Sequence, residues 1–516
     1  MWLHADIKSL ADIPRYHAKK SPTKTALKGN GRSLTFQELD ASTNRVAHAI
    51  VKTGIPRLSH VSFLGKNSIE YLEVLFGANK AGCAMLPLNW RASAAELAAV
   101  IDDANTPLVF VDKEYAGLLE DIQSRVSTRF TVIPFDSTSA DASPLRELLA
   151  SVPDGDPKIE IHPEDTALLM YTSGTTGKPK GVQMSQGGLN YMRLCEHLEP
   201  AYQWEAEDVM MFVMPNFHLV GTGLTVQALY NGVTITILPA LVVPEVLRTI
   251  AEDRPSICCL VPTAIQMLLD HPEAKNTDFS SLRMVWYAGS SITSQVLKRA
   301  ILEMKCKFMQ FYGATESCGA LTLLRPEQHV IEDEQKLKSC GTALPLIEIR
   351  IVDQFDEEVA QGGVGEFLVR APSLFKGYWK QPEATEAALQ DGWYRSGDVG
   401  YKDAEGLFYI VDRAKDMIVS GGENIYSTEV EQALVKHPAV AMTAVFGVPD
   451  EQWGERVTAV VVLANGETVT EEELFEHCRT LISRYKVPKK IIFADQLPMT
   501  PTGKIKKTSI RSQYGS

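Results

Sequence analysis

The sequence YTSGTTGKPKG, residues 171–181, decides how this chain is expected to fold and what it can hold. The residues before it, 165–170, form an apolar run that predicts a buried strand leading into a turn. The residues after it, 181–185, predict a second strand, so the loop should join two strands. Glycines let backbone N–H groups approach a ligand closely, and Ser and Thr hydroxyls add donors. With two lysines in the same run, the loop fits a phosphate chain.

Two other interpretations of this loop can be compared with phosphate binding. It is not a Walker A loop, because the G-x-x-x-x-G-K-[ST] spacing is absent. Pro179 also follows Lys178 directly, where a Walker loop would enter its helix. A solvated hairpin tip is the simpler interpretation of an ordinary Gly-rich loop. The composition of this run favours a ligand over a bare tip.

The composition indicates a globular protein of more than one domain. The chain has 516 residues, 45% of them hydrophobic, and domains usually span about 100–200 residues. No apolar stretch reaches the ~18–20 residues of a membrane span, and the N-terminus lacks the apolar segment of a signal peptide. A net charge of −13 argues against nucleic acid as a partner. An anionic ligand would therefore need local basic groups.

The cysteines indicate the compartment. The eight cysteines are scattered and form no C-x-x-C pair, so neither a zinc site nor a disulfide framework is indicated. We therefore expect a reducing compartment and a cytoplasmic protein.

The pattern of elements changes along the chain. Up to about residue 324, apolar strands alternate with helices, which is the α/β pattern. Residues 345–410 shift to short strands and turns, and they predict a small β-barrel or meander. After residue 427 a new α+β unit begins. There Thr428 and Glu431 predict a capping box at the start of a helix.

Four further stretches carry residues that could do chemistry. QFYGATES, residues 310–317, presents Glu316, which could hold Mg²⁺, and Tyr312, which could stack on a base. WYRSGDVG, residues 393–400, places Asp398 in a Gly turn, where it could bind ribose hydroxyls. The other two stretches are DRAKDMIVSGGENIYS, residues 412–427, and PMTPTGKIKK, residues 498–507. Taken singly, these residues have simpler interpretations, namely a strand-end acid, an Asx turn and a solvated lysine.

Together, the five stretches resemble the adenylate-forming superfamily of acyl-CoA synthetases, aryl-CoA ligases, luciferases and peptide-synthetase adenylation domains. The resemblance covers nearly the whole chain and is strongest to bacterial fatty-acid–CoA ligases. It implies an α/β fold with a large N-terminal domain, residues 1–412, made of two doubly wound α/β subdomains plus a small β-barrel. It also implies a smaller, mobile α+β C-terminal domain, residues 413–516.

The resemblance implies two half-reactions in one site. ATP and a carboxylate first give an acyl-adenylate and pyrophosphate, and a thiol, here coenzyme A, then displaces AMP. A carboxylate is a poor nucleophile toward a polyanionic triphosphate, so the first step needs charge neutralisation and positioning. ATP, Mg²⁺ and coenzyme A are thus the implied co-substrates and cofactor. A small carboxylic acid completes the expected partners, and a homodimer stays open.

The resemblance also assigns roles to residues of this chain. The implied phosphate loop comprises Thr172, Ser173, Gly174, Thr175, Thr176, Gly177, Lys178 and Lys180. The nucleotide is further held by Gly289, Ser290, Ser291, Tyr312, Gly313, Thr315, Asp398 and Arg413. The implied Mg²⁺ ligands are Glu316 and Thr176. The implied catalytic residues are Lys504, Glu316, Thr172 and His218, with Lys504 bridging the carboxylate and the α-phosphate.

The resemblance further implies that the C-terminal domain rotates between the two steps. The hinge position corresponds to Lys415. One arrangement brings Lys504 into the site. The other brings Gly421 and Gly422 to the pantetheine tunnel, where glycine permits close backbone approach.

The acid is expected to be apolar. The implied substrate pocket comprises His218, Gly221, Gly289 and Phe311. His218 stands where amino-acid-activating members usually carry Asp, which argues against an amino-acid substrate. Phe311 stands where the family often has Gly, so its ring should shorten or reshape the pocket. A medium- or long-chain fatty acid is favoured, and an aryl or cyclic acid of the cinnamate or benzoate kind is the alternative.

Competing functions share the same motifs. We expect a free-standing acid–CoA ligase without an appended carrier domain. A luciferase-like oxygenase would keep the same motifs, and a non-catalytic binding module is the third class. The presence of Lys504, Glu316 and Asp398 speaks against the binding module. Ser427 departs from the Pro often found after NIY in the family, and this change is expected to be harmless.

Overall fold

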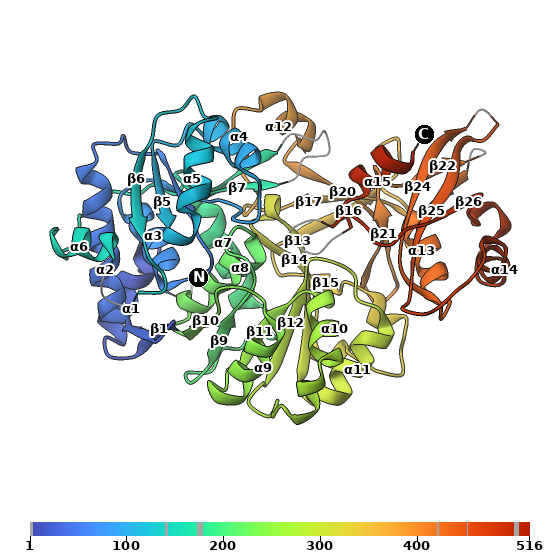
Figure 1. Ribbon diagram of the computed structural model, residues 1–516, viewed down its shortest axis with the longest axis horizontal. Helices are drawn as coiled ribbons and strands as arrows, with labels where there is room; N and C mark the ends of the chain where they lie inside the picture. Colours follow the sequence, from blue (N-terminus) through green and yellow to red (C-terminus); the bar gives the residue numbers. More distant parts are fainter. Residues whose placement is uncertain are drawn as a thin grey trace. The chain divides into compact units, whose positions relative to one another are not determined.

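The computed structural model describes residues 4–139, 143–172, 179–420, 423–450, 452–499 and 505–515. Contacts divide the chain into two compact units, whose elements are labelled in Figure 1. The first unit comprises Met1–Glu348 and Arg370–Tyr394, and the second unit comprises Ile349–Val369 and Arg395–Ser516. The domain boundary predicted between residues 412 and 413 stays a prediction.

In the described part of the first unit, the larger sheet has nine strands in the order β15-β14-β13-β12-β11-β9-β10-β1-β2. Neighbours from β13 to β1 are parallel, whereas β14, β15 and β2 add antiparallel strands at the edges. In sheet order the strands are Thr342–Ala343, Gly319–Leu324, Lys307–Ala314, Met284–Ala288, Ile257–Leu260, Val209–Phe212, Thr234–Ile237, Thr25–Gly29 and Arg32–Thr35. Parallel strands buried on both faces are continuously apolar, as in the fully buried β11 sequence ICCL.

Among the described residues of the first unit, the second sheet has seven strands in the order β18-β8-β7-β4-β3-β5-β6. Strands β7, β4, β3, β5 and β6 are parallel neighbours, and β8 and β18 are antiparallel. In sheet order the strands are Gly377–Tyr378, Lys180–Ser185, Thr166–Thr172, Ala84–Pro87, His60–Leu64, Leu108–Asp112 and Thr131–Phe135. Two mostly parallel sheets with helices between their strands confirm the α/β prediction.

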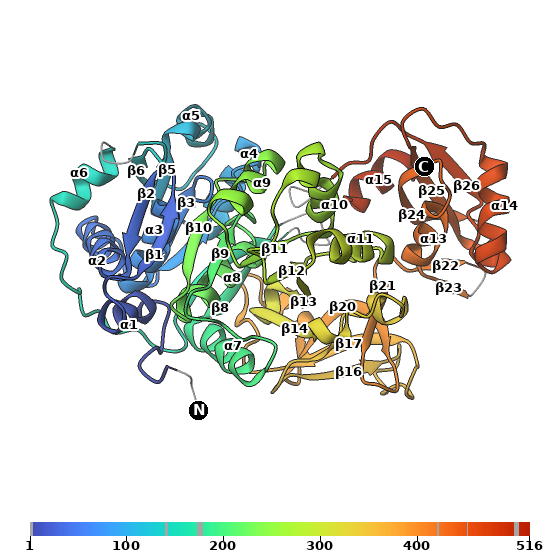
Figure 2. The ribbon, with the colours of Figure 1, turned by 90° about the horizontal axis from the view of Figure 1, so that it is seen from below.

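Helices cover both sheets of the first unit. In chain order, α1 to α12 are Asp12–Lys20, Phe36–Lys52, Ile69–Lys80, Ala94–Ala104, Ala116–Gln123, Pro144–Ala150, Gln186–Leu198, Leu219–Tyr230, Val243–Glu252, Pro262–Asp270, Ser294–Met304 and Pro382–Ala388. Helices α9, α10 and α11 cover one face of the nine-stranded sheet, through a core that includes Val285 and Phe308 (Figure 2). Helix α8 packs against β9, β10 and β14.

Short strands and an α+β fold make up the rest of the chain. Among the described residues, one sheet has five strands: the order is β16-β17-β20-β19, and β21 pairs with β20. Strands β16, β17, β20, β19 and β21 are Glu348–Val352, Gly365–Arg370, Trp393–Lys402, Leu389–Gln390 and Phe408–Arg413. In a second sheet the order is β23-β22-β25-β24, and β26 pairs with β25. Strands β23, β22, β25, β24 and β26 are Glu423–Ile425, Ile418–Ser420, Gly454–Leu463, Val440–Asp450 and Lys490–Phe493. Helices α13, α14 and α15 are Ser427–Val435, Glu471–Leu481 and Lys507–Tyr514. The predicted fold class, with a smaller α+β part at the C-terminal end, is confirmed.

The capping box predicted for Thr428 and Glu431 is wrong. Helix α13 begins at Ser427, and no side chain caps it. The Thr428 hydroxyl instead donates to the carbonyl oxygen of Val411, and the Glu431 carboxylate accepts the N–H of Val445 at 2.8 Å. Contacts with other elements therefore override the local capping signal.

Two features are absent from the described ranges. None of the helices there combines the length and the apolar character that crossing a membrane requires. Within the same ranges, no group of three or more His, Cys, Asp and Glu side chains is placed to hold a metal ion.

Candidate active site

The predicted phosphate loop lies between β7 and β8, so its expected place between two strands is confirmed. The two strands are antiparallel, and the last pair before the loop is Thr172 with Lys180. The two described ends of the loop therefore lie side by side. The remaining predicted loop residues, Ser173, Gly174, Thr175, Thr176, Gly177 and Lys178, lie outside the described residues.

Lys180 lies beside Tyr378, a residue that no sequence pattern indicated. The Lys180 ammonium is 4.7 Å from the centroid of the Tyr378 ring, a distance typical of a cation–π contact. Tyr378 belongs to β18 and pairs with Val182 of β8. Its hydroxyl donates to Oε1 of Glu316 at 2.9 Å. Burial, and then the negative charge of Glu316, raise the pKa of Tyr378, so this hydroxyl keeps its proton.

Glu316, a predicted Mg²⁺ ligand, lies in the 3₁₀ turn Thr315–Ser317 directly after β13. The Phe375 N–H donates to the Glu316 carbonyl oxygen at 2.8 Å and fixes this turn. Among the described residues, the Glu316 carboxylate has no ion-pair partner, and its hydrogen bond comes from Tyr378. Such a carboxylate fits Mg²⁺, which proteins usually bind through one or two carboxylates together with substrate phosphates.

The residues predicted on the adenine side follow two neighbouring parallel strands. Ala288, the last residue of β12, pairs with Phe311 of β13. Gly289 and the half-buried Tyr312 therefore emerge at the same edge of the sheet. We call this edge, formed by Gly289–Ser291 and Tyr312–Glu316, the sheet edge. Ligands of open α/β sheets bind outside the carboxyl ends of such strands.

Glycine is required at two positions of the sheet edge. Gly289 has a φ of +92°, in the region that favours glycine. At Gly313 an added Cβ would overlap the carbonyl oxygen of Gly319. The side chains of Ser290 and Ser291 are exposed. The sheet edge therefore offers backbone and hydroxyl groups to a ligand.

The predicted acyl-side residues begin at the N-terminus of α8. His218 is the N-cap of this helix, and its ring lies 4.4 Å from that of Phe217 between centroids. Gly221 is buried in the first turn of α8. Helix α8 packs against β14, and β14 pairs with β13, the strand that carries Phe311.

Phe311 belongs to a group of four aromatic residues that we call the aromatic wall: Tyr202, Trp204, Trp286 and Phe311. The Phe311 ring lies 5.5 Å from Tyr202 and 5.2 Å from Trp286 between centroids, and Trp204 lies 5.2 Å from Trp286. Phe311 is 6% exposed. Neighbouring residues of a strand point to opposite faces, so Trp286 lies on the face opposite Val285 and the core under α9, α10 and α11.

Two predicted ribose residues meet in the second unit. Asp398 of β20 pairs in register with Arg413 of β21. The Arg413 Nε lies 2.6 Å from the Asp398 Oδ1, and the Asp398 side chain is 4% exposed whereas that of Arg413 is 48% exposed. The buried Asp398 carboxylate is therefore paired with the half-exposed Arg413 guanidinium, whose exposed side can also face a ligand.

The predicted hinge residue Lys415 is exposed. Its carbonyl oxygen accepts from Nη2 of Arg511 at 3.4 Å, and Arg511 also pairs with Asp416 at 3.0 Å. Helix α15 therefore contacts the segment that carries the predicted hinge residue. The other predicted residues of this part, Gly421, Gly422 and Lys504, lie outside the described residues.

A second unpredicted group surrounds Ser427. We call Asp412, Ser427, Glu431 and Lys507 the hinge-side cluster. The N–H and the hydroxyl of the buried Ser427 donate to Oδ2 of Asp412 at 2.5 and 2.8 Å. The Lys507 ammonium donates to the Ser427 hydroxyl at 2.6 Å and lies 2.8 Å from Oε1 of Glu431. Proline at 427 could make neither of the contacts with Asp412.

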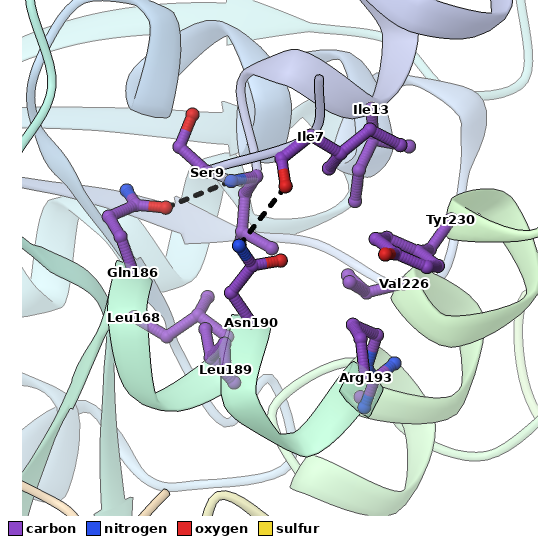
Figure 3. A pocket seen from close by; sticks show the side chains of 12 residues that line it. Ile7, Ser9, Ile13, Leu168, Gln186, Leu189, Asn190, Arg193, Val226 and Tyr230 are labelled. Carbon is purple, nitrogen blue, oxygen red and sulfur yellow. Dashed lines mark hydrogen bonds between the residues drawn. The ribbon is translucent and has the colours of Figure 1, made fainter. Parts of the chain in front are cut away.

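A small cavity lies between α7, α8 and the segment before α1 (Figure 3). Its volume is about 10 Å³, room for about one water molecule. The Asn190 amide donates to the Ile7 carbonyl oxygen at 3.1 Å, and the Leu10 N–H donates to Gln186 at 2.9 Å, so the N-terminal segment closes it. This cavity is too small for a carboxylic acid.

Comparison with known proteins agrees with this geometry. The family model described as AMP-binding enzyme matches residues 15–379, and the one described as AMP-binding enzyme C-terminal domain matches residues 429–504. The chain therefore belongs to the AMP-binding enzyme family. The predicted adenylate-forming superfamily is thereby confirmed.

Similar proteins narrow the class. A feruloyl-CoA synthase of Amycolatopsis is 36% identical over 98% of this chain and 99% of its own length. The fatty acid–acyl-carrier-protein ligase ScoC of Streptomyces coeruleorubidus is 32% identical over 99% of this chain and 97% of its own. A solved Mycobacterium tuberculosis fatty acyl CoA synthetase has a TM-score of 0.80 and 32% identity, and the match covers 99% of each chain. This chain is an AMP-forming acyl-CoA synthetase, with ATP and coenzyme A as co-substrates.

Proposed function

We propose that this enzyme activates an apolar carboxylic acid as an acyl-adenylate and then transfers the acyl group to coenzyme A. One observation carries the proposal: Lys180, Tyr378 and Glu316 form a contact chain from the end of the predicted phosphate loop to the sheet edge. A cation beside the phosphate loop and an acid beside the adenine turn are the groups that a triphosphate needs. The order of these groups along the contact chain supports a nucleotide lying across them.

In the first half-reaction, we assign charge neutralisation to groups around the triphosphate. Thr172 and Lys180 would hold the β- and γ-phosphates together with the rest of the loop. Glu316 would hold Mg²⁺, which when bound supplies positive charge to the phosphates. Lys504 would bridge the carboxylate and the α-phosphate as negative charge develops there. Tyr312 would stack on the adenine.

In this proposal, residues of the second unit bind the ribose and take part in the second half-reaction. Asp398 would accept the ribose hydroxyls, and Arg413, already paired with it, would contact the ribose or a phosphate. A domain of residues 413–516 would rotate about Lys415 after adenylation. Gly421 and Gly422 would then line the path of the pantetheine thiol. The exposed position of Lys415 supports this hinge assignment.

For the acid, we favour a medium- or long-chain fatty acid. The support is an apolar helix start at α8, with Gly221 buried in its first turn, and the likeness to a fatty acyl CoA synthetase. His218 would lie near the carboxylate, at the N-cap of the same helix.

An aryl acid is the second candidate, and a specific observation favours it. Phe311 forms part of the aromatic wall and would present a ring beside the acyl site. Aromatic rings pack favourably against other rings in offset or edge-to-face arrangements. The likeness to a feruloyl-CoA synthase points to the same class of acid.

A panel of acids tests this proposal. Saturated acids from C6 to C18 and a cinnamate and benzoate series are assayed for coenzyme-A-dependent AMP release. A maximum within the saturated series supports the fatty-acid assignment, and a maximum at a ring acid supports the aryl assignment. AMP release from none of these apolar acids would contradict the proposal. The cytoplasmic location and the homodimer stay predictions.

A further inference from the structure

Tyr378 contacts Glu316 and Lys180, two charged residues that are proposed to bind the triphosphate and its Mg²⁺. Its hydroxyl donates to Oε1 of Glu316 at 2.9 Å, and its ring lies 4.7 Å from the Lys180 ammonium. Glu316 and Lys180 come from different sheets of the first unit, because Glu316 follows β13 and Lys180 begins β8. A single side chain therefore joins the metal-ligand candidate to the loop lysine.

The backbone of Tyr378 is held firmly enough to define this position. Tyr378 pairs with Val182 of β8, and its N–H donates to the hydroxyl of Thr385 at 2.9 Å. Two residues earlier, the Lys376 N–H donates to the Gln183 carbonyl oxygen at 2.9 Å. The Tyr378 side chain is buried, with 8% of the residue exposed. These contacts fix the backbone from which the Tyr378 side chain projects toward Glu316 and Lys180.

The chemistry of the two contacts explains why a tyrosine suits this place. A lysine and a glutamate that lie close together usually neutralise each other in an ion pair, and neither is then fully available to a ligand. Tyrosine offers the glutamate a neutral hydrogen-bond donor and offers the lysine the face of a ring. In the described part of the chain, Lys180 and Glu316 form no ion pair with each other. The two charged side chains therefore do not neutralise each other and can both bind the nucleotide or its Mg²⁺.

We infer that Tyr378 is a positioning residue for adenylation, which keeps Lys180 and Glu316 apart and aims both at the β- and γ-phosphates and their Mg²⁺. This inference rests on the proposed function. It makes no use of Tyr378 as an acid or a base. It predicts that the hydroxyl and the ring make separable contributions, since one contacts Glu316 and the other contacts Lys180.

The test compares Tyr378→Phe with Tyr378→Leu in the full-length enzyme. Calorimetry measures the affinity for α,β-methylene-ATP, a non-cleavable analogue, over a series of Mg²⁺ concentrations. Tyr378→Phe loses only the hydroxyl, so we expect about tenfold more Mg²⁺ for half-maximal binding, the size of one hydrogen bond to a charged group. Tyr378→Leu also loses the ring, so we expect a further severalfold loss of analogue affinity.

Two controls distinguish a positioning role of Tyr378 from a general loss of structure in the variants. Tyr230→Phe removes the hydroxyl of another buried tyrosine, at the end of α8, and should leave both affinities within twofold of wild type. An acyl-sulfamoyl adenosine carries no β- or γ-phosphate, so its affinity should stay within twofold in Tyr378→Phe. Equal weakening of both ligands would overturn the inference, and so would an unchanged Mg²⁺ requirement. If wild type itself failed to bind the analogue with Mg²⁺, the proposed function would fail and not merely the role of Tyr378.

Discussion

The sheet edge of the first unit and the hinge-side cluster of the second unit hold polar groups in different ways. At the sheet edge the backbone places them, because β12 and β13 are parallel neighbours and Gly289 turns with a positive φ. In the hinge-side cluster, side chains hold one another, because Ser427 donates to Asp412 and accepts from Lys507. We therefore expect the groups of the sheet edge to keep their places through the reaction, and the side-chain contacts of the hinge-side cluster to be exchanged.

This difference indicates how the two half-reactions can be divided. We expect substitutions in the first unit to change which ligands bind and how tightly. We expect substitutions in the second unit to change one half-reaction relative to the other.

The largest effect is expected for Lys504→Ala, in the second unit. Adenylate formation should fall by about 10²–10³-fold, the usual effect of removing one preorganised group that stabilises developing charge. Thioester formation from a supplied acyl-adenylate should be largely spared, because that step needs no charge at the α-phosphate. Separate single-turnover assays measure the two steps. Equal loss in both assays would contradict the assigned role.

The next effect is expected for Lys415→Pro. Proline fixes φ and removes the N–H, so it should hold the hinge in one arrangement. We expect pyrophosphate release in a single turnover to continue, with thioester formation largely lost. Lys415→Ala is the matched control and should keep both steps. Unchanged steady-state coenzyme A ligation by the proline variant would exclude the rotation.

Phe311→Gly tests the first unit and should change substrate preference about tenfold. Removing the ring opens a void that a longer or bulkier acid can fill, at about 0.8 kcal/mol for each newly buried methylene. The best original acid should lose efficiency, since it no longer fills its pocket. The ratio of kcat/KM between successive acids measures the shift.

A matched control distinguishes a role of Phe311 in the acyl pocket from a role in the hydrophobic core. Phe308 lies on the same strand but in the core under α9, α10 and α11. Phe308→Ala should lower the free energy of unfolding by about 3–5 kcal/mol and leave the order of acids unchanged. If Phe311→Gly behaves like Phe308→Ala, the aromatic wall is core and the size limit lies elsewhere.

The smallest effect is expected for Ser427→Pro. Proline is tolerated at the first position of a helix, so α13 should persist while both donor contacts to Asp412 are lost. The free energy of unfolding should fall by about 2 kcal/mol, within the range for hydrogen bonds to a charged group. The ratio of the two half-reaction rates should also change severalfold.

Ser427→Ala removes only the hydroxyl and serves as the control for Ser427→Pro. It keeps the N–H contact to Asp412, so its loss of stability should be about half as large. Denaturant unfolding and single-turnover rates measure both variants. A proline variant that matches wild type in both measurements would show that the hinge-side cluster has no role.

The two regions also differ in what the sequence could reveal. The hairpin that carries the predicted phosphate loop could be predicted because glycines, hydroxyls and apolar runs are adjacent in residues 171–181. The residues of the sheet edge followed from the resemblance to the adenylate-forming superfamily. Tyr378 was missed because its partner Glu316 is 62 residues away and a Tyr after Gly in a strand-rich stretch reads as an ordinary sheet residue.

The hinge-side cluster was missed for the same physical reason. Ser427 meets Asp412 across 15 residues and Lys507 across 80, and only the packing of α13 and α15 brings them together. The predicted capping box failed because Thr428 and Glu431 found partners in β21 and β24. Local patterns therefore predicted backbone-built features, and they did not predict side-chain networks.

One isotope measurement tests the central claim, that the acid attacks the α-phosphorus of ATP. The best acid from the panel is labelled with ¹⁸O at both carboxyl oxygens, and the enzyme converts it to the coenzyme A thioester. Mass spectrometry then measures the ¹⁸O content of AMP, inorganic phosphate and the thioester. The account predicts one ¹⁸O atom in the AMP phosphate and one retained in the thioester carbonyl, because thiol attack leaves the bridging oxygen on AMP. Unlabelled AMP, or ¹⁸O in inorganic phosphate, would contradict an acyl-adenylate intermediate.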